Sequence, residues 1–442
     1  MNRSGNIYNV GVNAKDTWRH LGAFETAAAI TGEKAVFNAV IVIKLSPLPG
    51  ENQLLRAMSA MQRRHPFLRC NISRRRGRRV FVPLNRAIPL YNREINNDTD
   101  WIPVAESELN TPFRDPELPL VRLVRLSHRE KEAGELILTF HHAIMDAPSA
   151  ISLVNELLSK NPEHVAATSL PPPAPEKGFP RRFLAPWGKI TSLPFLFRSM
   201  AEELPGALSI RKKKASPRNN KAWIHTATLP EAVSRELSRA CRRRGISLNS
   251  LAGAAMLRTL HAGNGPSGKK RRRHISFADL RPRLSPPRET DSLCCSISML
   301  RLTLSLNEDT SIWDTAVRLQ ARIERALSRG DLFSSVLWSP FMMRALFMGT
   351  GSRMADSALS LSGPVDVPES SGNVRLLDLH AFVSNFSRGP EFTAQARMFR
   401  GRLYWDMVFL ESDMNRRDAD TLAGDFTKML KNAIKEDHAG SG

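Results

Sequence analysis

The stretch from Gly134 to Leu153 constrains the fold of this chain most strongly, because it joins a strand pattern directly to a helix pattern. Its apolar run at 136–140 predicts a short buried strand. Two adjacent histidines, His141 and His142, follow where that strand ends, and Asp146 begins a helix N-terminus that leads into residues 151–158. Such a junction is a rigid support for a reactive side chain, so it favours a functional role over a strand that merely ends in histidines.

The rest of the chain repeats this mixture of strands and helices in two halves. The 442 residues, of which 42% are hydrophobic, suffice for more than one core. The pattern predicts one subdomain over residues 1–160 and a second over 222–442. The segment 161–221 between them is rich in proline and then in basic residues, which is typical of a connector.

The formal net charge of +21 indicates attraction to an acidic partner. The basic runs are scattered, however, and none alternates with aromatic residues as a surface that stacks on bases does. Specific nucleic-acid binding is therefore the weaker hypothesis, and a steep salt dependence of tight binding to arbitrary DNA would favour it. The basic runs lie at 74–79, 211–214, 242–244 and 269–273.

The cysteines and the apolar segments bear on the compartment. The four cysteines have no spacing typical of a disulfide framework or a metal site, which predicts a reduced, cytoplasmic protein. No apolar run reaches the ~20 residues of a membrane span, and the amino end lacks the apolar core of a secretion signal. The cysteines are Cys70, Cys241, Cys294 and Cys295.

Residues 141–147, HHAIMDA, closely resemble the HHxxxDG signature of the acyltransferase superfamily with the chloramphenicol-acetyltransferase-like fold. That superfamily includes peptide condensation domains, alcohol acetyltransferases and polyketide-associated acyltransferases. The resemblance runs from about residue 18 to 435. Three further stretches support it, namely RHPFLR at 64–69, NTPF with the following LPLVR at 110–122, and SLSGPV with the later GRL at 360–403.

This resemblance implies a fold and a reaction. The fold is mixed α/β, with two chloramphenicol-acetyltransferase-like subdomains in a pseudo-dimeric V around a central channel. The reaction is acyl transfer from a thioester, on coenzyme A or a phosphopantetheinyl acyl-carrier protein, to a hydroxyl or amine acceptor. The implied protein is a free-standing monomer with no bound cofactor, and its basic charge suits a phosphorylated donor or an acidic carrier protein.

The resemblance also assigns roles to site residues. His142 is the general base, and neutral imidazole is available for that task near pH 7. His141 supports it, because neighbouring side chains on a strand point to opposite faces; a metal site on these residues is not expected. Asp146 is a structural anchor, for which we expect an ion pair with Arg69. Arg281 supports the loop.

Position 147 departs from the motif, because Ala147 stands where the family has glycine. Glycine there would allow a positive φ or leave space for a substrate, whereas a methyl group requires a negative φ or narrows the path. Two alternatives to acyl transfer stay open. One is an inactive relative that binds carrier proteins, and the other is the nucleic-acid-binding protein considered above.

Overall fold

The computed structural model describes residues 17–158, 170–208, 221–263, 271–289, 292–349, 353–365, 367–371 and 373–439. The basic run at 211–214 and the first two residues of the run at 269–273 lie outside these ranges. The chain divides into two compact units. Unit 1 comprises Met1–Phe179, Arg281–Ser296 and Val367–Val383, and unit 2 comprises Pro180–Leu280, Ile297–Asp366 and Ser384–Gly442.

Each unit thus combines three segments of the chain, whereas the sequence predicts two continuous subdomains with a connector. Two pieces of the later half, 281–296 and 367–383, belong to unit 1. The segment predicted as a connector is divided at residue 180 between the units. The predicted V-shaped arrangement and its channel stay predictions.

The large sheet of unit 1 has, among the described residues, the strand order β12-β13-β2-β7-β6-β5. Strands β6 and β7 form an antiparallel hairpin, in which Val121 lies opposite Phe140. Strand β13, from the later half of the chain, pairs antiparallel with β2. The bounds are β2 (Asn38–Ser46), β5 (Leu90–Ile95), β6 (Val121–His128), β7 (Gly134–His141), β12 (Ser370–Ser371) and β13 (Val374–Val383).

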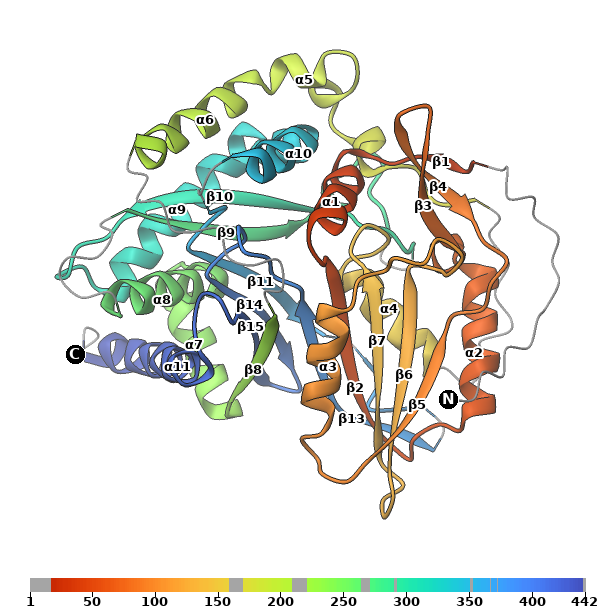
Figure 1. Cartoon of the computed structure of the whole chain (residues 1–442). Helices are drawn as coiled ribbons and strands as arrows, with labels where there is room; N and C mark the ends of the chain where they lie inside the picture. Colours follow the sequence, from red (N-terminus) through yellow and green to blue (C-terminus); the bar gives the residue numbers. More distant parts are fainter. Residues whose placement is uncertain are drawn as a thin grey trace. The chain divides into compact units, whose positions relative to one another are not determined.

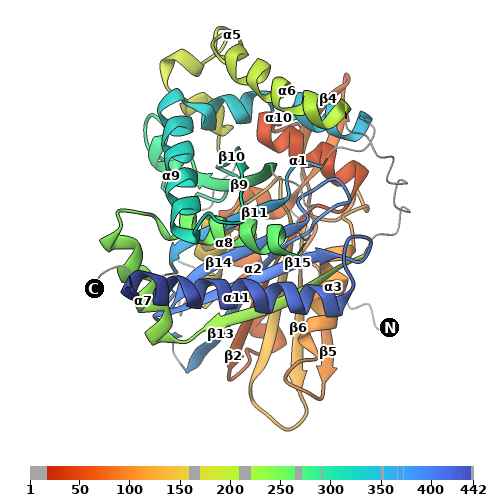
Figure 2. The same ribbon diagram turned by 90° about the vertical axis from the view of Figure 1, so that its left-hand side faces the viewer.

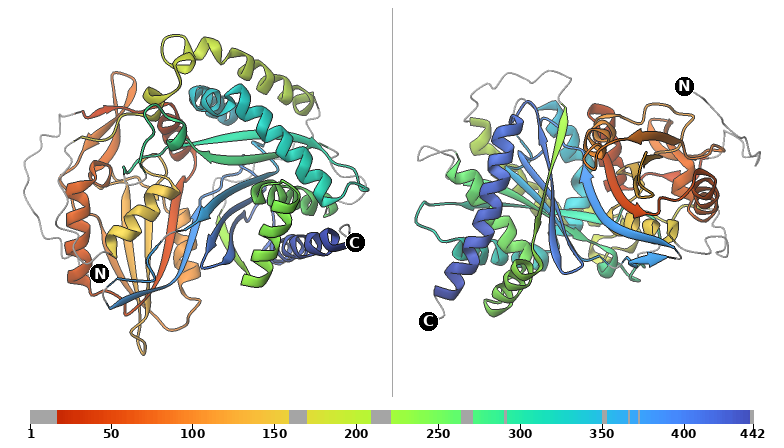
Figure 3. Two further views of the ribbon diagram at one scale, coloured as in Figure 1. Left: turned by 180° about the vertical axis from the view of Figure 1, so that it is seen from behind. Right: turned by 90° about the horizontal axis from the view of Figure 1, so that it is seen from below.

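Helices cover both faces of this sheet. On one face, α2 (Glu51–Arg64) and α4 (Ala147–Leu157) meet around Leu138 of β7. On the other face, Trp101 of α3 (Trp101–Asn110) stacks on His380 of β13. Figure 1 shows α3 in front of the sheet, and the left view of Figure 3 shows α4 on its other side. Because both faces are covered, β7 is buried along its whole length.

The remaining parts of unit 1 lie near the amino end. Helix α1 (Ala23–Lys34) follows the short strand β1 (Arg19–His20). Strand β1 pairs with β4 (Arg78–Pro83), which pairs with β3 (Cys70–Arg75). The single helical turn η1 (Pro66–Arg69) leads from α2 into β3.

Unit 2 contains a second sheet, with the order β10-β9-β11-β14-β15-β8 among the described residues. Helices α7, α8, α9 and α11 lie over one face of it (Figure 2), where Trp405, Trp313 and Phe426 contribute to a buried core. The strands are β8 (Ala222–Leu229), β9 (Arg271–Asp279), β10 (Ile297–Ser305), β11 (Ser357–Pro364), β14 (Phe392–Phe399) and β15 (Arg402–Leu410).

The helices of unit 2 begin at hydrogen-bonding caps in two clear cases. The Ser247 side chain accepts the Ser250 N–H at the start of α8, and Ser311 does the same for Asp314 at the start of α9. The bounds are α5 (Gly188–Thr191), α6 (Leu193–Leu208), α7 (Glu231–Arg243), α8 (Leu248–Ala262), α9 (Ile312–Arg329), α10 (Asp331–Met348) and α11 (Arg416–Ala439).

Two sequence-level observations have structural counterparts. All four cysteines are free thiols and buried. No helix within the described residues has the length and apolar character needed to cross a membrane.

Candidate active site

His142 is the first residue after β7, at the point where the chain leaves the sheet. Its backbone N–H donates a hydrogen bond of 3.1 Å to the carbonyl of Phe37, the residue before β2. The Phe37 ring stacks on the imidazole with the ring centres 5.3 Å apart. His142 is therefore held between the end of one strand and the start of its neighbour.

The imidazole of His142 is hydrogen-bonded to the loop that follows it. Its Nδ1 lies 3.0 Å from the carbonyl oxygen of Met145. A carbonyl oxygen only accepts, so Nδ1 carries the proton and Nε2 carries the lone pair. Burial lowers the pKa of His142 below its usual value, and the nearby carboxylate of Asp146 acts in the opposite direction. The ring is therefore neutral at pH 7, with Nε2 available as a base.

His141 lies in different surroundings from His142. Its Nδ1 accepts the N–H of Ala143 at 3.1 Å, which ties the ring to the loop that carries His142. On the other side of the ring, a Cβ built on Gly32 of α1 would lie 2.3 Å from Nε2. Burial lowers the pKa of His141 to about 4, with the neighbouring His142 adding to the effect. His141 is thus a neutral residue that braces the loop against α1.

Asp146 is fully buried and caps α4 by accepting the N–H of Ser149 at 3.2 Å. Its second oxygen accepts the N–H of Ser296 at 2.7 Å. Both oxygens also face Arg281, whose Nη1 and Nη2 lie at 2.8 and 2.9 Å. Four hydrogen bonds to one carboxylate leave it no capacity to act as a proton carrier for the histidines.

The predicted ion pair between Asp146 and Arg69 is wrong. Arg69 donates to the carbonyl of Gln62 at 3.1 Å, and its guanidinium lies over the Trp18 ring. Arg69 is the last residue of η1, the turn between α2 and β3. Arg281 lies 135 positions after Asp146 in the sequence, so its contact with Asp146 could not be predicted from neighbouring residues.

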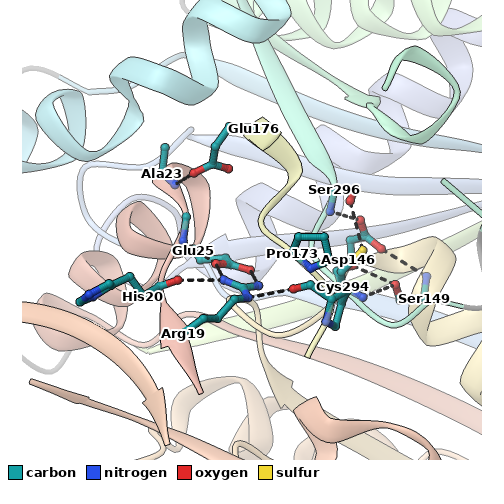
Figure 4. A network of polar contacts seen from close by, with 12 residues as sticks. Arg19, His20, Ala23, Glu25, Asp146, Ser149, Pro173, Glu176, Cys294 and Ser296 are labelled. Carbon is teal, nitrogen blue, oxygen red and sulfur yellow. Dashed lines mark hydrogen bonds and ion pairs between the residues drawn. The ribbon is translucent and has the colours of Figure 1, made fainter. Parts of the chain in front are cut away.

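Arg281 also joins Asp146 to a second polar group. Its Nη2 donates to the Ser149 hydroxyl at 2.7 Å and to the Cys294 carbonyl at 3.0 Å. The Ser149 hydroxyl in turn donates to that carbonyl and accepts the N–H of Cys294. Figure 4 shows Asp146 between Ser149 and Ser296, with Cys294 beside them. The segment 281–296 is thereby fastened to the start of α4. Ser149 was not singled out from the sequence, where it reads as an ordinary residue of a helix start.

A second network lies at the start of α1. Glu25 is fully buried, and its two carboxylate oxygens accept hydrogen bonds from Nη1 and Nη2 of Arg19 at 2.7 and 2.6 Å. Glu176 accepts the N–H of Ala23 at 2.6 Å, and burial raises the pKa of its carboxyl. Arg19 further donates to the carbonyl of Pro172 at 2.8 Å. Figure 4 shows Arg19, Ala23, Glu25 and Glu176 at the start of α1, the helix that lies against His141.

Ala147 is the first residue of α4. Among the described non-glycine residues, only Arg76 and Arg400 have a positive φ. The backbone at 147 is therefore in a region open to alanine, and the methyl group causes no backbone strain. The departure from the HHxxxDG signature does not distort the loop that presents His142.

The donor groups around the histidines do not form a metal site. No set of three His, Cys, Asp or Glu side chains within the described residues could hold a metal ion. Cys295 lies beside the site, with its Sγ 3.9 Å from Nδ1 of His142, but burial raises its thiol pKa well above the usual value. It is thus a neutral neighbour of the base.

The chain resembles known acyltransferases in sequence and in fold. Residues 219–409 match the family profile described as the phthiocerol/phthiodiolone dimycocerosyl transferase C-terminus. Polyketide synthase associated protein 5 from Mycobacterium tuberculosis aligns over 95% of this chain and 99% of its own, with a TM-score of 0.69 and 17% identity. The chain has the fold of the CoA-dependent acyltransferase superfamily. The superfamily resemblance and the mixed α/β class predicted from the sequence are thereby confirmed.

Two further comparisons found proteins similar to this chain. The TRI3 trichothecene 15-O-acetyltransferase from Fusarium sporotrichioides aligns over 94% of this chain and 95% of its own, with a TM-score of 0.69 and 13% identity. A linear gramicidin synthase from Brevibacillus parabrevis is 30% identical over 143 residues, which are 28% of this chain and 2% of that protein. The chain thus matches a very small part of the length of that curated relative.

Proposed function

We propose that this protein transfers an acyl group from a thioester to a hydroxyl or amine acceptor, with His142 as the general base. The observation that carries the proposal is the hydrogen bond between Nδ1 of His142 and the carbonyl of Met145. That bond fixes the tautomer whose Nε2 has a free lone pair. Burial, which lowers the pKa of His142, keeps this form populated at pH 7.

The proposed step needs no covalent intermediate on the protein. Nε2 of His142 takes the proton from the acceptor as the acceptor oxygen or nitrogen attacks the thioester carbonyl. The tetrahedral intermediate then collapses, the carbon–sulfur bond breaks, and the imidazolium returns its proton to the departing thiolate. The products are an ester or amide and a free thiol, and His142 is neutral again.

The other site residues position this base. His141 holds the loop through the N–H of Ala143. Asp146 holds the same loop through Arg281 and the helix cap. We assign Arg69 to the turn that precedes β3 and not to the support of His142. Ala147 keeps the helix start without strain, which favours an active enzyme over an inactive relative.

The donor is proposed to be coenzyme A or a phosphopantetheinyl carrier protein. The phosphates of coenzyme A and the acidic surface of a carrier protein both complement a chain with a net charge of +21. The relatives point the same way, because they include a protein associated with a polyketide synthase and a gramicidin synthase. No resident cofactor is part of the proposal, and we place the reaction in the cytoplasm.

The test is a release assay for free thiol with acyl thioesters of graded chain length, in the presence and absence of candidate alcohols and amines. We expect acceptor-dependent thiol release by the wild-type protein and none above background by His142→Ala. Thiol release that is equal for both proteins across the whole panel would show that His142 is not the base. Binding of carrier protein without turnover by either would instead support the inactive relative.

A further inference from the structure

Helices α5 and α6 present large apolar side chains to solvent. Trp187, just before α5, is 66% exposed, and Ile190 in α5 is 56% exposed. Phe197 and Met200 in α6 are 65% and 51% exposed. The members of each pair are three residues apart and so lie on the same side of a helix. Figure 1 shows the two helices following each other along α10, with one side turned away from the rest of unit 2. We call these four side chains the apolar ridge.

The opposite side of α6 is fixed to unit 2 by polar contacts. Arg198 pairs with Asp331 of α10 at 2.7 Å. The carbonyl of Ser199 accepts from Arg301 of β10 at 3.1 Å, and Glu202 accepts from Thr303 at 3.1 Å. This part of α6 therefore directs these polar contacts inward while Phe197 and Met200 point outward, where an ordinary surface helix exposes polar side chains.

Apolar anchors also hold the start of this segment in place. Phe183 is buried against Phe333 of α10, with ring centres 5.1 Å apart. Gly330 has a φ of +78°, which glycine adopts readily. It also lies so close to the Phe183 ring that a Cβ on residue 330 would be 2.5 Å from a ring carbon. Leu196 is buried as well. The segment is thus packed against unit 2 through Phe183 and Leu196, and the apolar ridge is its solvent-facing side.

Basic residues border the ridge up to its last member, Met200, and Glu202 and Glu203 follow it in α6. Every charged side chain between residues 178 and 201 is basic. Arg181, Arg182 and Lys189 are exposed beside the ridge. Arg198 is neutralised by Asp331, so the outward charge comes from the other three. A fixed row of tryptophan, phenylalanine and aliphatic side chains bordered by lysine and arginine is the composition of helices that lie in a membrane interface.

We propose that α5 and α6 dock this protein on the surface of a bilayer that contains anionic lipids. The ridge enters the boundary between headgroups and acyl chains, and the three basic residues lie at the level of the anionic headgroups. The helices lie on the membrane and do not cross it. This inference concerns a surface of unit 2 and stands without the proposed acyl transfer.

The experiment must separate insertion of the ridge from adsorption of a protein whose charge is +21. The full chain is sedimented with vesicles of phosphatidylcholine alone and with vesicles that also contain phosphatidylglycerol. Each measurement is repeated at about 1 M salt, where the Debye length is about 3 Å and exposed charges are screened. We expect wild-type protein to prefer the anionic vesicles and to keep a measurable part of its binding at high salt.

Two sets of variants test the ridge and its border. Trp187→Ser with Phe197→Ser removes the two aromatic side chains, and we expect partitioning at high salt to fall at least about tenfold. Its matched control, Leu55→Ser with Val317→Ser, removes exposed apolar groups from α2 and α9 and should leave partitioning unchanged. Arg181→Gln with Arg182→Gln and Lys189→Gln should weaken binding to anionic vesicles at low salt on the order of 100-fold.

A control variant for the charge also removes three positive charges, but from other parts of the surface. Arg56→Gln with Arg93→Gln and Arg242→Gln replaces exposed arginines on three other elements. We expect it to weaken binding far less than the variant at 181, 182 and 189. Equal effects of the two charge variants would show non-specific adsorption and overturn the proposal.

Fluorescence gives a readout at a single position. Vesicles with brominated acyl chains quench tryptophans that enter the membrane, and the chain has seven tryptophans. We expect quenching in the wild-type protein that disappears in Trp187→Phe, while vesicle binding remains. Absence of quenching overturns the proposal. The proposal is also overturned if the protein self-associates with rising concentration in sedimentation velocity and the variant Trp187→Ser with Phe197→Ser does not. A second copy of the chain, and not a membrane, would then cover the ridge.

Discussion

Arg281 and Asp146 form a two-point ion pair across 135 positions of sequence, with nitrogen–oxygen distances of 2.8 and 2.9 Å. Both side chains are almost fully inaccessible to solvent. The pair joins the segment 281–296 to the helix start that follows His142. The loop that carries the proposed base thus depends on a residue from a remote part of the chain.

Breaking this pair should destabilise the protein strongly. Asp146→Ala leaves Arg281 buried without its counter-ion, which typically costs about 3–5 kcal/mol. We expect that loss in the free energy of unfolding measured with urea, together with a loss of thiol release. Because Asp146→Ala and Arg281→Ala remove the same interaction, the double variant should lose less than the sum of the single losses.

Arg69 provides the control for that experiment. It pairs with the Gln62 carbonyl and the Trp18 ring and not with Asp146. The changes for Asp146→Ala and Arg69→Ala should therefore add to within about 0.5 kcal/mol. A coupling energy between 146 and 69 as large as that between 146 and 281 would contradict the assignment of Arg281 as the partner.

His142→Ala should separate activity from folding. The residue follows a strand that is hydrogen-bonded to both neighbours, and its ring is hydrogen-bonded to the carbonyl of Met145 in the loop. We expect a cooperative unfolding transition close to that of the wild type and a fall in kcat/KM of at least about 10²-fold. A variant that keeps full turnover in the thioester assay would exclude His142 as the base.

Gly32→Ala should disturb the site through His141. The added Cβ would lie 2.3 Å from Nε2 of the imidazole, so the ring or α1 has to move. We expect a loss of about 1–3 kcal/mol of stability, as for other overpacked cores, and reduced turnover. Gly424→Ala is the matched control in a helix, because no atom lies within 4 Å of its built Cβ. It should gain about 0.5–1 kcal/mol and leave turnover unchanged.

Stability should fall in acid because buried histidines are held neutral. Burial lowers the pKa of His141 to about 4 and that of His274 to about 3, both below the unfolded value of 6.5. The unfolded chain therefore binds more protons below pH 6.5. The stabilisation is complete above that pH and is lost as pH falls toward the folded values.

His274 offers a clean measurement of this effect. Its Nδ1 lies 2.8 Å from the Ser357 hydroxyl, and its Nε2 has no hydrogen-bond partner within the described part of the chain. In urea unfolding between pH 6 and 4, His274→Asn should show a slope shallower by about 1.4 kcal/mol per pH unit than the wild type. An unchanged slope would mean that His274 is protonated in the folded protein.

Ala147→Gly should not improve the enzyme. The residue begins α4 without a positive φ, so glycine adds only conformational freedom to the unfolded chain. We expect a loss of about 0.5–1 kcal/mol in urea unfolding. The kcat/KM values across the thioester panel should be unchanged. A selective gain for bulky acceptors would show instead that the methyl group narrows the substrate path.

The sequence predicts those features whose cause is local. The strand 136–140 and the helix that follows it are specified by apolar periodicity and by an aspartate at a cap, and both are present as β7 and α4. The histidine pair at their junction was identified for the same reason. Helix α10 was not predicted, because it is apolar on all sides and contains Pro340, so no amphipathic period marks it.

Long-range partners could not be derived in this way. Arg69 and Arg281 are both single arginines beside prolines or apolar residues, and nothing local distinguishes which of them reaches Asp146. A strand such as β13 can be predicted from its own residues, but its pairing with β2 depends on a chain path of more than 300 residues. Pairing over such distances is decided by the packing of the whole unit and not by propensity.

The assignment of β13 and of 281–296 to unit 1 sets the order in which this protein becomes complete during translation. A ribosome releases β2 early, while the strand that covers its edge emerges only with residues 374–383. Until residue 281 has been made, the nascent chain holds Asp146 without its cation. A product that stops short of residue 281 therefore carries an open apolar strand edge, which recruits other unfinished chains. We therefore expect premature termination to yield aggregates and not a smaller enzyme.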